Sequence, residues 1–269
     1  MAERGESAAE LKGAAFFDLD KTLMAGSSGM VFARVANRKG FVPRRQLAKW
    51  GFDHLRYRLR GSSDEQTNAV LEVAKRVFAE IPERDVERMA PEVLAGILPR
   101  IYPQMLAEVH RHQDDGRATF IVSAAGNDLV KALAAVLGME GGIGTGWEVG
   151  PDGKFTGEMD GPFVYGKGKV EAMRRFADRH DIDLAESWAY SDSVSDLPML
   201  RAVGHAVVVN PDADLLEIAR QEDWRVMRFE KLGRKLAIAG ATLLAAAAGG
   251  AAASASRRRN SGRRLPSWR

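Results

Sequence analysis

The stretch Ala14–Thr22 reads AAFFDLDKT, and the architecture expected for the rest of the chain starts from it. Four apolar residues are followed by two carboxylates one residue apart, Asp18 and Asp20. An apolar run without polar alternation is typical of a strand that is buried on both faces of a parallel sheet. Ligands of open α/β sheets lie just beyond the carboxyl ends of the strands. We therefore expect Asp18 and Asp20 at that edge.

Two carboxylates held close together repel each other, so the pair needs a cation, a shared proton or both. Magnesium meets this need, because it takes a few oxygen ligands and keeps room for a substrate phosphate. The pattern D-x-D-x-T also arises by chance, and the alternative interpretation is two surface acids in a turn between a strand and a helix. The two interpretations differ in whether polar residues also follow the other strands.

Length and composition allow a substantial core and exclude cysteine chemistry. The chain has 269 residues, of which 45% are hydrophobic, enough for one large domain or two small ones. It has no cysteine, which excludes disulfides and thiolate metal sites and is compatible with a reducing compartment. Residues 1–13 carry charges of both signs and no apolar run. We therefore expect no signal peptide and a cytoplasmic location.

The net charge of +3 conceals an asymmetry along the chain. Residues 228–269 hold ten basic residues and one Glu, a charge of +9, so residues 1–227 carry −6. Residues 236–256 are uncharged and long enough to cross a bilayer as a helix, but they are mostly Ala and Gly, which makes insertion marginal. A single span would also export the arginines at 257–264, against the positive-inside rule.

Three interpretations of this tail stay open: a membrane-inserted helix, contact of the basic end with anionic lipid, and a disordered or self-packing segment. No aromatic platform or base-reading motif accompanies the arginines, so no nucleic-acid partner is expected. The sequence does not indicate an oligomeric state.

Helical patterns fill the chain from Met30 to Leu98, and from Pro103 onward helices alternate with apolar runs. The alternation predicts an α/β fold, a Rossmann-like doubly wound parallel sheet with an inserted α-helical cap after the first strand. The expected parts are an N-terminal extension at 1–13, a core at 14–29 and 103–230, the cap at 30–102, and an Ala-rich helix with a basic tail at 231–269. The expected later strands are Ala118–Val122, a hairpin within Gly141–Met159, Ser187–Ser191, Ala206–Val209 and Arg225–Phe229.

Polar residues follow several of these strands or begin the helices after them. Besides the first pair of acids they are Ser123, Lys169, Asp192 and Asp196. Cleavage of a phosphate monoester needs such a set: a carboxylate nucleophile, an acid to protonate the leaving oxygen, and cations and donors for the phosphoryl oxygens. The sequence therefore favours phosphoryl chemistry at the sheet edge.

In these segments the chain resembles the haloacid dehalogenase superfamily, in the phosphoserine phosphatase-like subclass (subfamily IB). The segment FFDLDKT resembles its first motif, IVSA its second, GKVEAMRRFA its lysine motif and YSDSVSDLPML its acidic fourth motif. The resemblance implies that Asp18 is a nucleophile that becomes an aspartyl-phosphate and that Asp20 is the general acid and later the base. It further implies Mg²⁺ held by Asp18, the Asp20 carbonyl and Asp192.

The same resemblance implies a set of residues around the substrate. Ser123 and Lys169 would bind the phosphoryl group, and Thr22 and Ala124 would also bind the substrate. Asp196 would orient Lys169 or the surroundings of the metal. Lys167 lies close to the lysine position as well. The apolar spacing that follows, through Met173, Phe176 and Ala177, matches the family better from Lys169.

The substrate is less sharply indicated. Phosphoserine-specific relatives usually carry a Glu soon after the first motif, whereas here no acid lies between Asp20 and Asp53. The expected substrate is a small phosphomonoester, either phosphoserine-like or related to lipids. Arg56 and Arg58 could bind an acidic part of it, or could form a solvated helix face. A catalytically idle phosphate-binding or membrane-surface adaptor, and phosphoryl transfer to an acceptor other than water, are the alternative functions.

Two further features have plainer interpretations. The five histidines show no metal-ligand spacing, and we expect them on the surface. They are His54, His110, His112, His180 and His205. The glycines at 141–146 do not match a P-loop, so a hairpin is expected there instead of a nucleotide loop.

Overall fold

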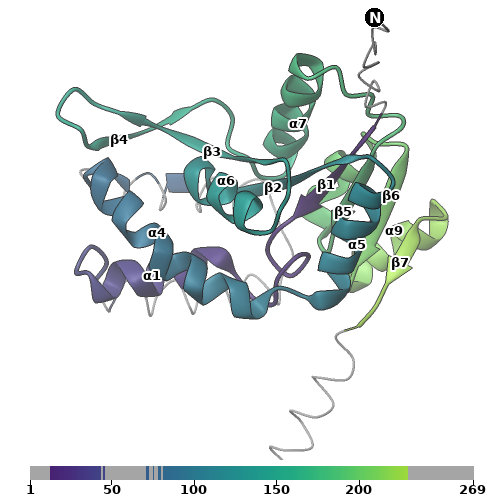
Figure 1. Cartoon of the computed structure of the whole chain (residues 1–269), viewed down its shortest axis with the longest axis horizontal. Coiled ribbons are helices and arrows are strands. Elements are labelled where there is room, and N and C mark those ends of the chain that lie inside the picture. Colours follow the sequence, from purple (N-terminus) through teal and green to yellow (C-terminus); the bar gives the residue numbers. More distant parts are fainter. Residues whose placement is uncertain are drawn as a thin grey trace, which may run out of the picture. The chain divides into compact units, whose positions relative to one another are not determined.

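A computed structural model describes residues 13–43, 45, 71, 72, 75, 78, 79 and 81–229. The chain through Met227 forms one compact unit, built on a seven-stranded sheet in the order β4-β3-β2-β1-β5-β6-β7 (Figure 1). All neighbouring strands are parallel except β3 and β4, which form an antiparallel hairpin. The strands are β1 (Ala14–Asp18), β2 (Ala118–Gly126), β3 (Gly141–Val149), β4 (Phe155–Asp160), β5 (Trp188–Ser191), β6 (His205–Val209) and β7 (Arg225–Met227).

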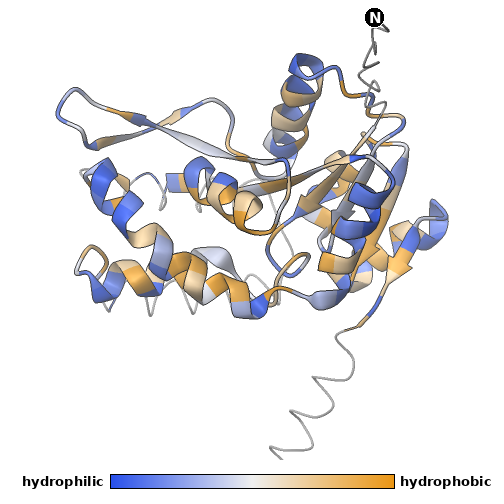
Figure 2. Ribbon diagram, in the orientation of Figure 1, coloured by the Kyte–Doolittle hydropathy of each residue, from blue (hydrophilic) through white to orange (hydrophobic). Residues whose placement is uncertain are grey.

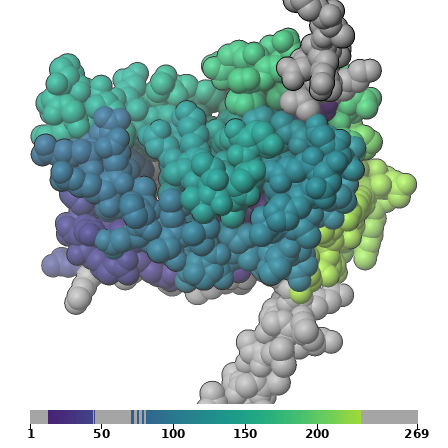
Figure 3. All heavy atoms as spheres, viewed as in Figure 1, coloured from purple at the N-terminus to yellow at the C-terminus, as the bar shows by residue number. Residues whose placement is uncertain are grey.

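Helices cover both faces of this sheet, which confirms the predicted doubly wound α/β fold. On one face lie α5 (Pro103–Asp114) and α6 (Asn127–Val136), and on the other α7 (Lys167–Arg179), α8 (Leu197–Leu200) and α9 (Ala213–Gln221). Figure 2 shows apolar ribbon along the central strands and on helix sides that face them. In the space-filling view, α4 (Glu83–Ile97), α5 and α6 occupy the middle of the face turned to the viewer (Figure 3).

The first strand is buried on both faces, as its apolar run predicts. Every residue of β1 is buried, and successive side chains point to opposite faces. Phe16 stacks on Phe120 of β2 within the core under α7 to α9. Phe17 points the other way and stacks on Tyr190 of β5, with ring centroids 4.4 Å apart. Aromatic side chains therefore anchor β1 to its neighbours on both faces.

The described part of the cap segment contains α1 (Ser28–Arg38) and α4, which pack against each other. A Cβ at Gly96 of α4 would lie 2.6 Å from Cγ1 of Val31, so glycine permits this close approach. The β3–β4 hairpin contacts the same segment. Phe78 stacks on Trp147 of β3 at 4.7 Å and on Phe32 of α1 at 5.5 Å. The hairpin thus joins the sheet to the inserted helices.

Several predicted boundaries shift by a few residues. Strand β2 runs to Gly126, beyond the predicted end at Val122, and α7 begins at Lys167. A 3₁₀ turn, Val194–Asp196, leads directly into α8. The hairpin expected within Gly141–Met159 is confirmed as β3 and β4. No helix within the described residues is long and apolar enough to cross a membrane, and the candidate segment at 236–256 lies outside them.

A polar cluster lies under α5, on the face of the sheet that carries Phe17. Glu108 accepts hydrogen bonds from Tyr190 at 2.9 Å, from Arg111 at 2.8 Å and from both terminal nitrogens of Arg225 at 2.8 and 3.0 Å. Burial alone would raise the pKa of Glu108, but the bonds from Arg225, Arg111 and Tyr190 outweigh it and lower that pKa to about 2. The cluster ties α5 to β5 and to the edge strand β7.

The surface location expected for His112 is wrong, because its ring is fully buried beside Tyr190. The Tyr190 hydroxyl donates to Glu108, so His112 Nε2, 2.8 Å away, must donate to the Tyr190 oxygen. The other ring nitrogen then accepts from Arg117 at 3.3 Å, which requires the neutral imidazole. Burial and the nearby Arg111 and Arg117 lower the pKa of His112 to about 4. His54 lies outside the described residues, and the other three histidines are exposed as expected.

Replacing Glu108 by Gln should lower the free energy of unfolding by about 1–3 kcal/mol, because three donors lose a charged acceptor in a buried place. Urea unfolding at pH 7 measures the change. Glu222→Gln, which removes an exposed pair with Arg201, is the matched control and should cost less than about 1 kcal/mol. Equal effects of the two substitutions would contradict the structural role of the cluster.

His112 should make stability depend on pH. Its native pKa of about 4 lies below the ordinary 6.5, so the unfolded chain binds the extra proton between these values. The stabilisation is complete above pH 6.5 and is lost as the pH falls through 4. The stability advantage of the wild type over His112→Gln, measured by urea unfolding from pH 4 to 7.5, should shrink on acidification. His110→Gln, on the exposed side of α5, is the control, and a pH-independent difference for His112→Gln would refute the assignment.

Candidate active site

The strand order places the candidate residues at one edge of the sheet. From β1 the chain proceeds outward through β2 and β3, then returns to the other side of β1 with β5. Such a switch point leaves a crevice at the carboxyl ends of the strands. Asp18 is the last residue of β1, and Phe17 pairs with Tyr190 of β5, two residues before Asp192. The two carboxylates therefore follow neighbouring strands.

Lys169 is buried in the first turn of α7 and joins two of the acids. Its Nζ lies 2.6 Å from Asp18 Oδ1 and 2.7 Å from Asp196 Oδ2, and all three residues are less than 10% exposed. Burial alone would lower the pKa of Lys169, but the carboxylates of Asp18 and Asp196 outweigh it and raise the pKa above its usual value. The ammonium group therefore stays charged.

Asp18 has one carboxylate oxygen on Lys169 and a second that accepts no hydrogen bond from the described residues. Burial raises its pKa to about 6, against the opposing effect of Lys169, and the negative charge of Asp196 adds to the rise. An anionic Asp18 at neutral pH thus depends on positive charge close by. The unbonded oxygen is the one available to react.

Asp20 is oriented by the start of the following helix. Its Oδ1 accepts a hydrogen bond of 2.8 Å from the backbone N–H of Ser28, in the first turn of α1. The positive end of the helix dipole favours a carboxylate in this place. The backbone N–H groups of Leu23 and Met24 bond back to the carbonyls of Asp18 and Leu19, which holds the intervening turn. Asp20 is half-buried at the same edge as Asp18.

The end of β2 supplies groups suited to an anion. The pairing of β2 with β3 shifts register between Val122 and Gly126, so residues 123–125 leave the regular ladder. Ser123 is buried, and its Oγ accepts from the Ala125 N–H at 3.2 Å, which leaves the hydroxyl hydrogen free to donate. Thr22 is fully buried, and its Oγ1 has no hydrogen-bond partner among the described residues. Such an unpaired polar atom suggests a partner that arrives with a ligand.

Asp192 differs from the other acids, because no strong hydrogen bond neutralises it. Its nearest cation among the described residues is Lys21 Nζ, 3.7 Å from Oδ2. Burial and the negative charge of Asp18 raise the pKa of Asp192 well above its usual range. The described residues contain no group of three or more His, Cys, Asp or Glu placed to hold a metal. The expected magnesium ligands number only two carboxylates, Asp18 and Asp192, plus the Asp20 carbonyl, and these hard oxygen donors suit that ion.

The structure brings some of the predicted site residues together, leaves others apart, and adds residues that the sequence did not indicate. Lys169 lies in the acidic cluster, whereas Lys167 is exposed at the start of α7. Arg56 and Arg58 lie outside the described residues. Lys21 was missed, and so was Ser191, which is fully buried and donates to Asp196 Oδ2 at 2.7 Å. The serine directly before the Asp192 position in YSDSVSD was the available signal for the second.

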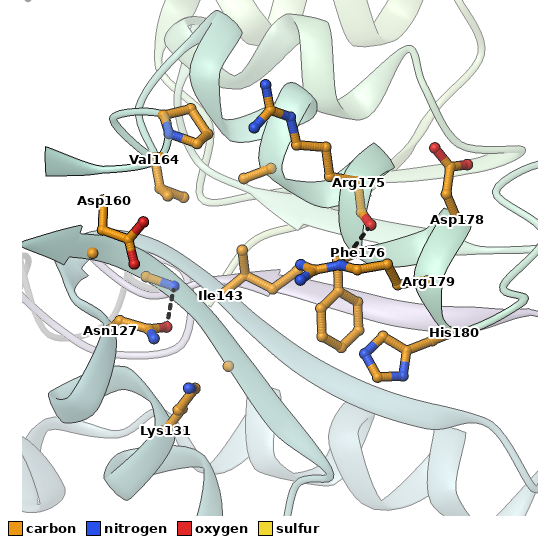
Figure 4. A pocket seen from close by; sticks show the side chains of 16 residues that line it. Asn127, Lys131, Ile143, Asp160, Val164, Arg175, Phe176, Asp178, Arg179 and His180 are labelled. Carbon is orange, nitrogen blue, oxygen red and sulfur yellow. Dashed lines mark hydrogen bonds between the residues drawn. The ribbon is translucent and has the colours of Figure 1, made fainter.

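A pocket of about 820 Å³ lies at the edge of β3, apart from these residues (Figure 4). Its wall includes Asp160 and Arg179, and none of the acids described above or Lys169 lines it. The glycines there are explained by packing, since a Cβ at Gly144 would lie 2.6 Å from Cα of Asn127. The interpretation of this stretch as a hairpin strand, and not as a phosphate loop, is confirmed.

Comparison with known proteins identifies the family of the chain. The family model of haloacid dehalogenase-like hydrolases matches residues 15–201. A Mycobacterium tuberculosis protein named "Probable phosphatase Rv3661" is 35% identical over 84% of this chain and 79% of its own length. Phosphoserine phosphatase SerB1 of the same species is 34% identical over 86% and 75%. A histidinol-phosphatase of Neisseria meningitidis is 30% identical over 82% of this chain and 100% of its own length.

Solved structures share the fold. A Bordetella pertussis protein described as having unknown function superimposes with a TM-score of 0.70 at 27% identity, covering 80% of this chain and 98% of that one. A phospho-aspartyl intermediate analogue of phosphoserine phosphatase gives a TM-score of 0.59 at 18% identity, covering 82% and 94%, and supports the fold alone. The chain belongs to the haloacid dehalogenase-like hydrolases, and with the relatives named above it is a phosphatase of that family.

Proposed function

We propose that this protein hydrolyses a small phosphomonoester with the help of Mg²⁺, by way of a phosphoryl group carried on Asp18. The observation that carries the proposal is the buried ammonium of Lys169, 2.6 Å from Asp18 and 2.7 Å from Asp196, at the sheet edge that also holds Asp20, Ser123 and Asp192. A nucleophile, an acid, donors and cations for a phosphoryl group are thus available in one place.

In the first step, the unbonded carboxylate oxygen of Asp18 forms a bond to phosphorus while the bond from phosphorus to the ester oxygen breaks. Asp20 gives its proton to that oxygen, so the alcohol leaves neutral. Asp20 can do so because its other oxygen is held by the Ser28 N–H, which fixes the direction of the carboxyl group. Lys169, the Ser123 hydroxyl and the Ala124 backbone would bind the phosphoryl oxygens, with the unpaired Thr22 hydroxyl close by.

In the second step, water replaces the alcohol. Asp20, now a carboxylate, takes a proton from the water as the water oxygen bonds to phosphorus and the bond from phosphorus to Asp18 breaks. Inorganic phosphate leaves, and both acids return to their starting states. The same acid therefore serves both half-reactions, which requires that it stay in place while the alcohol departs.

Asp18, Asp192 and the Asp20 carbonyl would hold the magnesium ion. When bound, it would supply the positive charge that offsets repulsion between the acids and the substrate phosphate. The charges of the site fit this need, because it holds four acids, Asp18, Asp20, Asp192 and Asp196, and two lysines, which pair with three of them.

The substrate is proposed only as a class. The curated relatives are named for phosphoserine and for histidinol phosphate, two small phosphomonoesters that differ in the alcohol. The stretch after Asp20 has no acid before Asp53. We therefore do not expect the contact between a Glu and the substrate ammonium that phosphoserine-specific enzymes use. A lipid-related phosphate stays within the proposed class.

Replacing Asp18 by Asn should lower phosphate release by roughly 10³-fold or more, because an amide cannot form the phosphoenzyme. Release is measured from phosphoserine, histidinol phosphate, glycerol phosphates, sugar phosphates and lysophosphatidate, with Mg²⁺ and with EDTA. EDTA should abolish wild-type turnover. Asp178→Asn, an exposed acid of α7, is the control and should retain full activity. If neither protein releases phosphate from any ester while both bind phosphate, hydrolysis is refuted and an adaptor role is favoured.

The two neighbouring lysines of α7 should behave very differently. Lys169→Met removes the cation shared by two buried acids, so activity should fall at least about 100-fold and the free energy of unfolding by about 3 kcal/mol. Lys167→Met removes an exposed cation two residues away and should change both by little. Steady-state kinetics and urea unfolding check this. A larger loss of activity in Lys167→Met than in Lys169→Met would show that Lys167, and not Lys169, contacts the phosphoryl group.

A further inference from the structure

Lys21 has a backbone conformation that is unusual for its residue type. Its φ is +62°, in the left-handed region, where a side chain other than glycine costs of the order of 1 kcal/mol. The other non-glycine residues with positive φ in the described chain are Asp181, Asn210 and Asp223, types that tolerate this region. A long side chain is therefore placed here at a cost, between Asp20 and Thr22.

The strained turn directs this side chain to Asp192. Lys21 Nζ lies 3.7 Å from Asp192 Oδ2, and the two side chains are 37% and 12% exposed. The contact is long and one-sided compared with that of Lys169, which is buried and holds two acids at 2.6 and 2.7 Å. One lysine of the site is fixed, whereas the other is held weakly and has room to move toward solvent.

We propose that Lys21 is a displaceable cation: it neutralises Asp192 while the metal position is empty and is driven off when a divalent cation binds Asp192. This inference rests on the proposed function, because it needs a metal bound by Asp192. A dication on Asp192 would repel the Lys21 ammonium, which has no second acid within 4.0 Å among the described residues. Lys169 differs, because Asp196 still holds it when Asp18 contacts a cation. The divalent ion must therefore displace Lys21, and the affinity of the site for metal is lowered by the work of breaking that ion pair.

The test is direct binding of Mg²⁺ alone, measured by isothermal titration calorimetry on the metal-stripped full chain. Lys21→Met keeps the length of the side chain and its backbone strain but removes the competing charge. It should bind Mg²⁺ roughly three- to tenfold more tightly than the wild type. The rise in melting temperature on adding saturating Mg²⁺ should also be larger in Lys21→Met, because its metal-free form lacks the internal cation. Lys167→Met, another exposed lysine near the site, should match the wild type in both measurements.

Asp192→Asn separates the possible failures. If it loses Mg²⁺ binding while Lys21→Met binds as the wild type does or more weakly, the displacement is refuted and the metal assignment stands. If Asp192→Asn keeps wild-type affinity, or the wild type binds no Mg²⁺, both the displacement and the proposed metal site are overturned. Tighter binding in Lys21→Met with loss in Asp192→Asn supports the proposal.

Discussion

The structure depends most on one ammonium group enclosed by two buried carboxylates. Lys169 bonds to Asp18 and Asp196, which are 151 and 27 residues away in the sequence. Buried charges are tolerated only when they are paired, and removing one partner leaves the other uncompensated. The end of β1, the start of α7 and the turn after β5 must therefore meet within hydrogen-bonding distance. Any packing that separates them would leave isolated charges in the core.

Contacts on the face of the sheet that is covered by α5 hold the ends of β1 and β5 in position. Phe17 and Tyr190 lie next to the carboxyl ends of β1 and β5 and stack at 4.4 Å, and Tyr190 is held in turn by Glu108 and His112. A slip of one residue between β1 and β5 would turn every side chain to the other face and break this stack. The polar cluster under α5 thus fixes the register on which the relative position of the acids depends. Strands β1 and β5 therefore carry both the packing that stabilises the fold and the acids of the site.

Sequence patterns predicted the sheet, its order of elements and the segments that meet at its edge, because buried strands and ordered motifs leave strong local signals. They did not predict His112, although Met105 and Val109 place it on the apolar stripe of α5 at helical spacing. The extension of β2 past Ser123 was missed because its register shift depends on pairing with a distant strand. Lys21 was missed because a positive φ at lysine has no sequence signature.

The two lysines of the site, Lys169 and Lys21, differ in how firmly the surrounding acids hold them. Lys169, bonded at 2.6 and 2.7 Å to two acids and itself 4% exposed, cannot leave without stranding both charges. Lys21 forms only an ion pair at 3.7 Å with one acid, and because its side chain is 37% exposed, it is already partly hydrated and can leave at a smaller cost. Lys169 is therefore a permanent part of the cluster, and in the proposed reaction no step frees it. The weak contact of Lys21 suits a cation that can be displaced. Asp192 could therefore exchange the charge of Lys21 for that of a divalent cation.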